Sequence, residues 1–156
     1  MIMLHEILRP ELIKIGLDAE KKRETISELM DILIQYHDVP MKHRGILLDG
    51  LYANEDSLGS GMARGIAVPH LATDLVEDVI CTIGISAKGI PFRSLDDKVA
   101  KVVVLLLVPK KDFLGEVQAI RGVQHLLESE ELLIKLIKSV GPQEAYTLIE
   151  AAEDGQ

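Results

Sequence analysis

The first half of the chain shows a helical pattern of hydrophobic and polar positions. After Asp18, a good N-cap residue, apolar residues recur at steps of three and four, and charged residues fill the opposite face. This stripe consists of Ile26, Leu29, Met30, Leu33 and Ile34. Pro40 breaks the pattern and is well placed to open a second helix through Leu51. From Asn54 to Gly65 the periodicity is lost, which predicts a long loop of the kind that often carries function.

Extended segments follow this loop. Gly65–Pro69 is predicted to be extended, because a residue before proline is biased towards β geometry. Val79–Ser86 and Lys101–Val108 are the two best strand candidates, with a turn at Lys88–Pro91 between them. Lys101–Val108 is apolar without alternation after its lysine, which predicts a strand buried on both faces of a covered sheet.

Helical periodicity returns after Pro109. Three further helices are predicted, around Leu114–Val123, Leu132–Ile137 and Glu144–Ala152. Helices, then strands, then helices predict an α/β fold in which helices cover both faces of a sheet. The length of 156 residues is that of one domain, and no repeat or linker divides it, so residues 1–156 are expected to form a single domain.

Composition and charge reduce the number of possible classes of function. The 17 Lys and Arg against 25 Asp and Glu give a net charge of −8, which disfavours a nucleic-acid binder. Cys81 is the only cysteine, so an internal disulfide and a cysteine-based zinc site are excluded. The N-terminus does not have the pattern of a signal peptide, and Val102–Val108 is too short to span a bilayer. We therefore expect a cytoplasmic protein that is not inserted in a membrane.

His70 is the strongest candidate for chemistry. It follows the glycine-rich segment Gly59–Gly65 and Pro69, and it is predicted to end a strand, where side chains of α/β folds project into a crevice. Glycines offer unobstructed backbone N–H groups to an anion, and imidazole can accept a phosphoryl group on nitrogen near pH 7. A second interpretation is equally good from position alone. In it, the glycine-rich segment is only flexible and His70 only closes a strand, without any chemistry.

Other chemistries fit less well. The histidines lack the spacing of a metal site, so neither metal nor cofactor is expected. The glycines of the segment Gly59–Gly65 precede a strand instead of opening a helix, as a dinucleotide motif requires, and no Lys-Ser/Thr pair of a phosphate-binding P-loop follows them.

The stretch Asn54–His70, which ends in Gly-Ile-Ala-Val-Pro-His, resembles the phosphorylation-site signature of fructose/mannitol-type enzyme IIA domains. These domains belong to the bacterial phosphoenolpyruvate-dependent phosphotransferase system and include the nitrogen-regulatory IIA proteins. The resemblance extends from about Leu8 to Ile149. It implies a mixed, mostly parallel β-sheet with helices on both faces. It also implies that His70 accepts a phosphoryl group from the phosphohistidine of the carrier HPr, and passes it to a IIB domain or serves as a regulatory signal.

Two residues depart from the family pattern. Asn54 stands before Glu55 where the family usually has an arginine, and Glu116 aligns with a second active-site histidine. A carboxylate at Glu116 would repel a phosphoryl group on His70 and favour the protonated imidazolium. Ser60 keeps the hydroxyl of the usual threonine, and Arg64 is the candidate to replace the missing positive charge.

Three classes of function follow. The first is a phosphoryl-carrier IIA protein that uses His70, a phosphotransferase if active. The second is a IIA-derived regulatory module with weak or no phosphotransfer, acting on a transporter or kinase, because of Glu116 and Asn54. The third is an unrelated α/β binding protein. The expected partners are phosphorylated HPr and a IIB domain or a regulated protein. The sugar, the reacting imidazole nitrogen and the formation of a homodimer stay open.

Overall fold

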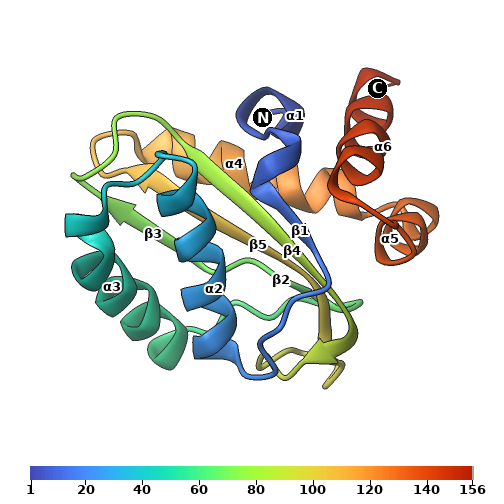
Figure 1. Ribbon diagram of the computed structural model, residues 1–156, viewed down its shortest axis with the longest axis horizontal. Coiled ribbons are helices and arrows are strands. Elements are labelled where there is room, and N and C mark those ends of the chain that lie inside the picture. Colours follow the sequence, from blue (N-terminus) through green and yellow to red (C-terminus); the bar gives the residue numbers. More distant parts are fainter. Residues whose placement is uncertain (156) are drawn as a thin grey trace.

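The computed structural model describes residues 1–155 and shows a five-stranded sheet between layers of helices (Figure 1). The strands are β1 (Ile13–Ile15), β2 (Ile66–Ala67), β3 (His70–Thr73), β4 (Ile80–Ile90) and β5 (Ala100–Pro109). Their order is β1-β4-β5-β2, and β3 also pairs with β5. The pairing of β4 with β5 is antiparallel and the other pairings are parallel. The expected α/β fold with a mixed, mostly parallel sheet is therefore confirmed.

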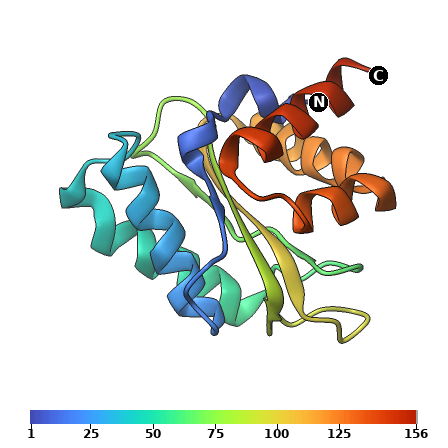
Figure 2. The ribbon, with the colours of Figure 1, turned by 45° about the vertical axis from the view of Figure 1, so that its right-hand side comes forward.

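The helices cover both faces of this sheet. They are α1 (Leu4–Ile7), α2 (Lys22–Gln35), α3 (Arg44–Ser57), α4 (Phe113–Leu127), α5 (Glu130–Ile137) and α6 (Pro142–Asp154), with short 3₁₀ turns η1 (Pro10–Leu12) and η2 (Met41–His43). Helices α2 and α3 lie on one face, and α4 and α5 on the other, with α1 and α6 packed together on the side of α4 (Figure 2).

Strand β5 lies inside the sheet, as its unbroken apolar run predicts. It pairs with β4 on one side and with β2 and β3 on the other, so the residues from Val102 to Leu107 are fully buried. Cys81 of β4 pairs with Leu106 and is equally buried, and this burial raises the pKa of its thiol. The core around β5 is thus mainly aliphatic.

Replacing Leu105 with alanine should destabilise the fold by about 2–5 kcal/mol, because the side chain is 0% exposed and its removal leaves a cavity. Denaturant unfolding of the purified chain measures the loss. Leu95→Ala is the matched control, since Leu95 is 96% exposed and should change stability by less than about 0.5 kcal/mol. Equal effects of the two variants would contradict the internal position of β5.

Two predicted boundaries were wrong around the glycine-rich segment. Asn54 to Ser57 belong to α3, and the loop begins only at Leu58. The helix continues because Glu55 is buried on its inner face and its carboxylate accepts the backbone N–H of Ser60. The predicted turn at Lys88–Pro91 is largely part of β4, which bends there through a register shift between Ile85 and Ile90.

The N-terminal part also differs from expectation. Asp18 does not cap a helix: α2 begins at Lys22, and the backbone N–H of Asp18 donates to Glu28. The short elements α1, η1 and β1 were not predicted, and neither was β3. These elements are too short for apolar periodicity to reveal them, and they are held by contacts with distant parts of the chain.

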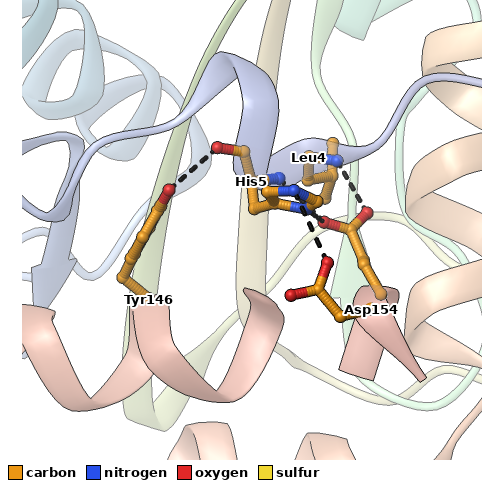
Figure 3. A network of polar contacts seen from close by, with 5 residues as sticks. Leu4, His5, Tyr146 and Asp154 are labelled. Atoms are coloured by element: carbon orange, nitrogen blue, oxygen red, sulfur yellow. Dashed lines mark hydrogen bonds and ion pairs between the residues drawn. The ribbon is translucent and has the colours of Figure 1, made fainter. Parts of the chain in front are cut away.

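A clasp of polar contacts joins the N-terminal segment to α6 (Figure 3). The buried carboxylate of Glu153 accepts the backbone N–H of Leu4 at 2.6 Å and both the backbone N–H and ring Nδ1–H of His5 at 2.8 Å. The Tyr146 hydroxyl donates to the His5 carbonyl. The hydrogen bond to Glu153 raises the pKa of His5. We define these four residues as the terminal clasp.

Candidate functional site

His70 is the first residue of β3, and not the last residue of a strand as the sequence predicted. Val68 and Pro69 separate β2 from β3, and both strands pair with β5, so His70 lies opposite Leu106 in the middle of that strand. The Pro69 carbonyl still accepts the N–H of Leu106, which keeps the interrupted edge in register. The histidine is therefore presented by a rigid sheet and not by a mobile loop.

The imidazole of His70 is held in one orientation. Its Nδ1 lies 2.8 Å from the carbonyl oxygen of Val68. A carbonyl can only accept, so Nδ1 carries a proton and donates it, and in the neutral imidazole the lone pair is then on Nε2. The side chain is 28% exposed and lines a hollow of about 170 Å³ together with Ser60 and Met62. A ring that is partly open to solvent and presents an unprotonated nitrogen is suited to nucleophilic attack.

Glu116 faces the free nitrogen of His70. Its Oε1 lies 3.8 Å from Nε2, and its side chain is 29% exposed. Asp112 caps the N-terminus of α4 by accepting the N–H of Gly115, which places Glu116 in the first turn of the helix. The structure thus brings Glu116 next to His70, where the alignment of the sequence put it.

Ser60 offers an uncommitted hydroxyl in the same hollow. Its backbone is fixed on both sides, because its N–H donates to Glu55 Oε1 at 3.1 Å and its carbonyl accepts the N–H of Val68 at 2.9 Å. Within residues 1–155 its buried Oγ has no hydrogen-bond partner. A buried hydroxyl without a partner costs free energy unless a ligand satisfies it, so this donor is available to an anion on His70.

Gly61 allows the loop to pack closely beside this hollow. A Cβ at Gly61 would collide with the backbone carbonyl of Arg93, so a side chain at this position would push the loop outward. The glycine is therefore explained by close approach of two backbone segments, which the sequence alone did not distinguish from simple flexibility.

Asn54 contacts His70 through the backbone. Its Nδ2 donates to the His70 carbonyl at 2.9 Å, so this side chain positions the histidine and brings no charge to the ring. In the part of the chain that the structure describes, no lysine or arginine lies within 4.0 Å of the Glu116 carboxylate. Among the described residues, the carboxylate that faces the imidazole therefore forms no ion pair with a lysine or arginine.

Arg64 does not take the place of the missing cation. Its guanidinium donates to the carbonyls of Leu127 and Glu128, both at 2.7 Å, at the C-terminal end of α4. Glu116 lies near the other end of that helix, about 17 Å away along its axis at a rise of about 1.5 Å per residue. The expectation that Arg64 supplies positive charge at His70 is therefore corrected, because the left-handed backbone of Arg64 (φ 65°) directs it elsewhere.

Sequence reasoning missed several contributors to the site. The Val68 carbonyl fixes the ring but is a backbone atom, which no side-chain pattern reveals. Three large apolar side chains near the site are exposed: Leu58 before the glycine segment, and Phe113 and Leu114 in the first turn of α4, at 80%, 73% and 67%. The apolar period had assigned Leu114 to the inner face of its helix, whereas the structure buries Gly115, Ala119 and Val123 there.

The described residues do not offer a metal site or a membrane span. Within residues 1–155 no three His, Cys, Asp or Glu side chains gather closely enough to hold a metal ion. Over the same residues, no helix has the length and apolar character needed to cross a bilayer.

Comparisons with known proteins agree with this fold. The family model described as "Phosphoenolpyruvate-dependent sugar phosphotransferase system, EIIA 2" matches residues 6–152. A fructose-specific EIIA component from Haloferax volcanii is 30% identical over 133 residues, which is 85% of each chain. The nitrogen regulatory protein IIA-Ntr from Neisseria meningitidis superposes with a TM-score of 0.84 at 17% identity, over 95% of this chain and 99% of that one. Escherichia coli IIA mannitol, solved in complex with phosphorylated IIB, superposes with a TM-score of 0.77 at 20% identity, over 92% and 97% of the two chains.

Proposed function

The chain belongs to the EIIA 2 family of the phosphoenolpyruvate-dependent sugar phosphotransferase system, and we propose that it carries a phosphoryl group on Nε2 of His70. The observation that supports this most directly is the hydrogen bond from Nδ1 to the Val68 carbonyl, which leaves Nε2 as the nucleophile. We also propose that residues 1–156 act as one IIA domain.

The transfer step follows from this orientation. The Nε2 lone pair forms a new N–P bond as the N–P bond of the donor phosphohistidine breaks, and the electron pair of that bond returns to the donor imidazole. Positive charge then develops on the ring of His70. The Val68 carbonyl, which accepts the Nδ1–H, stabilises that charge, and the Ser60 hydroxyl is available to the phosphoryl oxygens.

The proposed donor is a phosphorylated HPr-type carrier, and the proposed acceptor is a IIB domain or a regulated transporter or kinase. The Escherichia coli neighbour is a IIA protein in complex with phosphorylated IIB, which supports a protein partner of this kind. The exposed side chains of Leu58, Phe113 and Leu114 provide apolar area for such a partner close to the reacting nitrogen.

Incubation with phosphoenolpyruvate, enzyme I and HPr, followed by intact mass measurement, tests the proposal. We expect the protein to gain the mass of one phosphoryl group, and His70→Ala to gain none. His125→Ala is the matched control, because His125 lies on the exposed side of α4 and should not change the labelling. Labelling that persists in His70→Ala would overturn the assignment of the acceptor.

Replacing Ser60 with alanine should slow phosphorylation about three- to tenfold and leave stability nearly unchanged. The hydroxyl has no partner in the folded chain, so its removal loses no hydrogen bond there, whereas a phosphoryl group would lose about 1 kcal/mol of hydrogen bonding. Rates come from the mass assay and stability from thermal unfolding, with the exposed Ser57→Ala as control. A large loss of stability, or an unchanged rate, would argue against this role of Ser60.

The position of Glu116 favours a second function. Its carboxylate, 3.8 Å from Nε2, places negative charge where a phosphoryl group would be. We propose as the alternative a IIA-derived regulatory module that presents this charge to partners and turns over little or no phosphate. Wild-type protein that stays unlabelled under conditions in which another IIA protein is fully labelled would favour this alternative.

A further inference from the structure

A pocket of about 580 Å³ lies between the start of β5, the loop before it and helix α5. Its size is within the range of small-molecule sites. One part of its lining is aliphatic, formed by Val99, Leu133, Ile134 and Ile137. Ile134 and Val99 remain 46% and 40% exposed, so apolar surface is left open to a ligand there.

The rest of the lining is charged and is more positive than the molecule as a whole. It contains the cations Arg64, Lys98 and Lys101 and the carboxylates Asp97 and Glu130. Across residues 1–155, neither lysine has a carboxylate within 4.0 Å of its ammonium group. In a chain with a net charge of −8, two uncommitted ammonium groups beside an apolar wall favour an anion with an apolar body.

Arg64 is a strained residue held in place at the edge of this pocket. Its φ of 65° is unfavourable for a residue with a side chain, and three hydrogen bonds maintain it: its N–H donates to Asp96, and its guanidinium to the carbonyls of Leu127 and Glu128. Those two bonds use only part of the guanidinium, which has five N–H donors, so the side chain can still contact a ligand.

We propose that this pocket binds small branched aliphatic monocarboxylates. The hydrocarbon body packs on the aliphatic wall, and the carboxylate meets Lys98 and Lys101. The carboxylates of Asp97 and Glu130 reduce the positive charge of the lining, which disfavours multiply charged anions such as phosphate.

The pocket is distinct from the hollow at His70, but one segment borders both. Gly59–Gly65 lines the His70 hollow through Ser60 and this pocket through Arg64. A ligand in the pocket therefore contacts the same piece of backbone that carries the Ser60 hydroxyl. This proposal concerns ligand binding alone, so its test does not depend on whether His70 carries a phosphoryl group.

Titration of the ¹⁵N-labelled chain with 4-methylpentanoate, followed by NMR, tests the proposal. We expect saturable shifts at Arg64, Val99 and Ile134, with a dissociation constant on the order of 1 mM for so small a ligand. Acetate lacks the apolar body, 4-methylpentan-1-amine reverses the charge, and inorganic phosphate tests a multiply charged anion. Each should bind at least about tenfold more weakly. Equal binding of any one, or no saturable shift with 4-methylpentanoate, would overturn the proposal.

Two variants locate the binding. Ile134→Glu places a carboxylate on the aliphatic wall and Lys101→Met removes one ammonium group while keeping its stem; each should weaken binding about fivefold or more. Lys138→Met is the matched control, because this exposed lysine follows α5 outside the pocket and should leave binding unchanged. The dispersion of each spectrum reports that the variant is folded. Unchanged affinity in both pocket variants would show that the ligand binds elsewhere.

Discussion

Replacing Glu116 with histidine is expected to increase the rate of phosphorylation of His70 about 10- to 100-fold. The carboxylate lies 3.8 Å from Nε2, so it opposes both the arrival and the retention of a doubly charged phosphoryl group. At a half-exposed site this repulsion is on the order of 1.5–3 kcal/mol, after allowance for solvent screening. A histidine removes the charge and can donate a hydrogen bond to the phosphoryl oxygens.

Glu116→Met separates the loss of the charge from the gain of a hydrogen-bond donor. Methionine keeps about the length of the side chain, removes its charge and supplies no N–H donor, so a gain close to that of Glu116→His would assign the effect to electrostatics. The rate of mass gain with phosphoenolpyruvate, enzyme I and HPr is the measurement, and His70→Ala is the blank. If the wild type is labelled rapidly and neither variant improves it, the carboxylate turns away from Nε2 at no cost and the repulsion argument is wrong.

Replacing Glu153 with alanine is expected to destabilise the fold by about 3–5 kcal/mol, because the terminal clasp loses the buried carboxylate that accepts three of its hydrogen bonds. The side chain is buried, and three donors on Leu4 and His5 depend on it. Chemical denaturation at pH 6 measures the loss. Glu150→Ala on the same helix is the matched control, and a loss as small in Glu153→Ala as in the control would show that the clasp is weak.

The same clasp makes stability depend on pH. The hydrogen bond that His5 donates to Glu153 raises the pKa of His5 above its ordinary value of 6.5, so the folded state binds the proton more tightly than the unfolded chain. The resulting stabilisation is fully present below pH 6.5 and is lost as the pH rises through the raised value. His5→Ala should therefore lose this part of the decline in stability between mildly acidic and mildly alkaline pH. A parallel decline in both proteins would contradict the assignment to His5.

The sequence predicted those parts of the molecule that depend on periodicity or on a linear motif. The apolar run of β5 could be assigned to the sheet interior because burial on both faces leaves no room for alternation. Glu116 could be placed beside His70 only through the family resemblance, because it aligns with the second active-site histidine when Val108 and Pro109 are brought into register.

Other features depend on contacts that linear spacing does not encode. The side chain of Arg64 is directed by a left-handed backbone and by helix-end carbonyls more than sixty positions away, so its charge could not be located beforehand. His5 and Glu153 meet across 148 positions. The first residue of β3 is defined only by its pairing with β5, since His-Leu-Ala-Thr has no clear strand pattern.

The buried thiol of Cys81 can report how often the sheet beneath His70 opens. His70 pairs with Leu106, and Leu106 pairs with Cys81 on the next strand, so the three residues form one row across β3, β5 and β4. Alkylating reagents attack the thiolate, and Cys81 is both fully buried and raised in pKa, so the native thiol should be inert. Its labelling rate then measures how often the centre of the sheet opens. The labelling rate can be measured with the donor proteins present and absent. The comparison shows whether phosphorylation of His70 tightens or loosens the strands that hold it. It needs no added probe residue and is made on the wild-type protein.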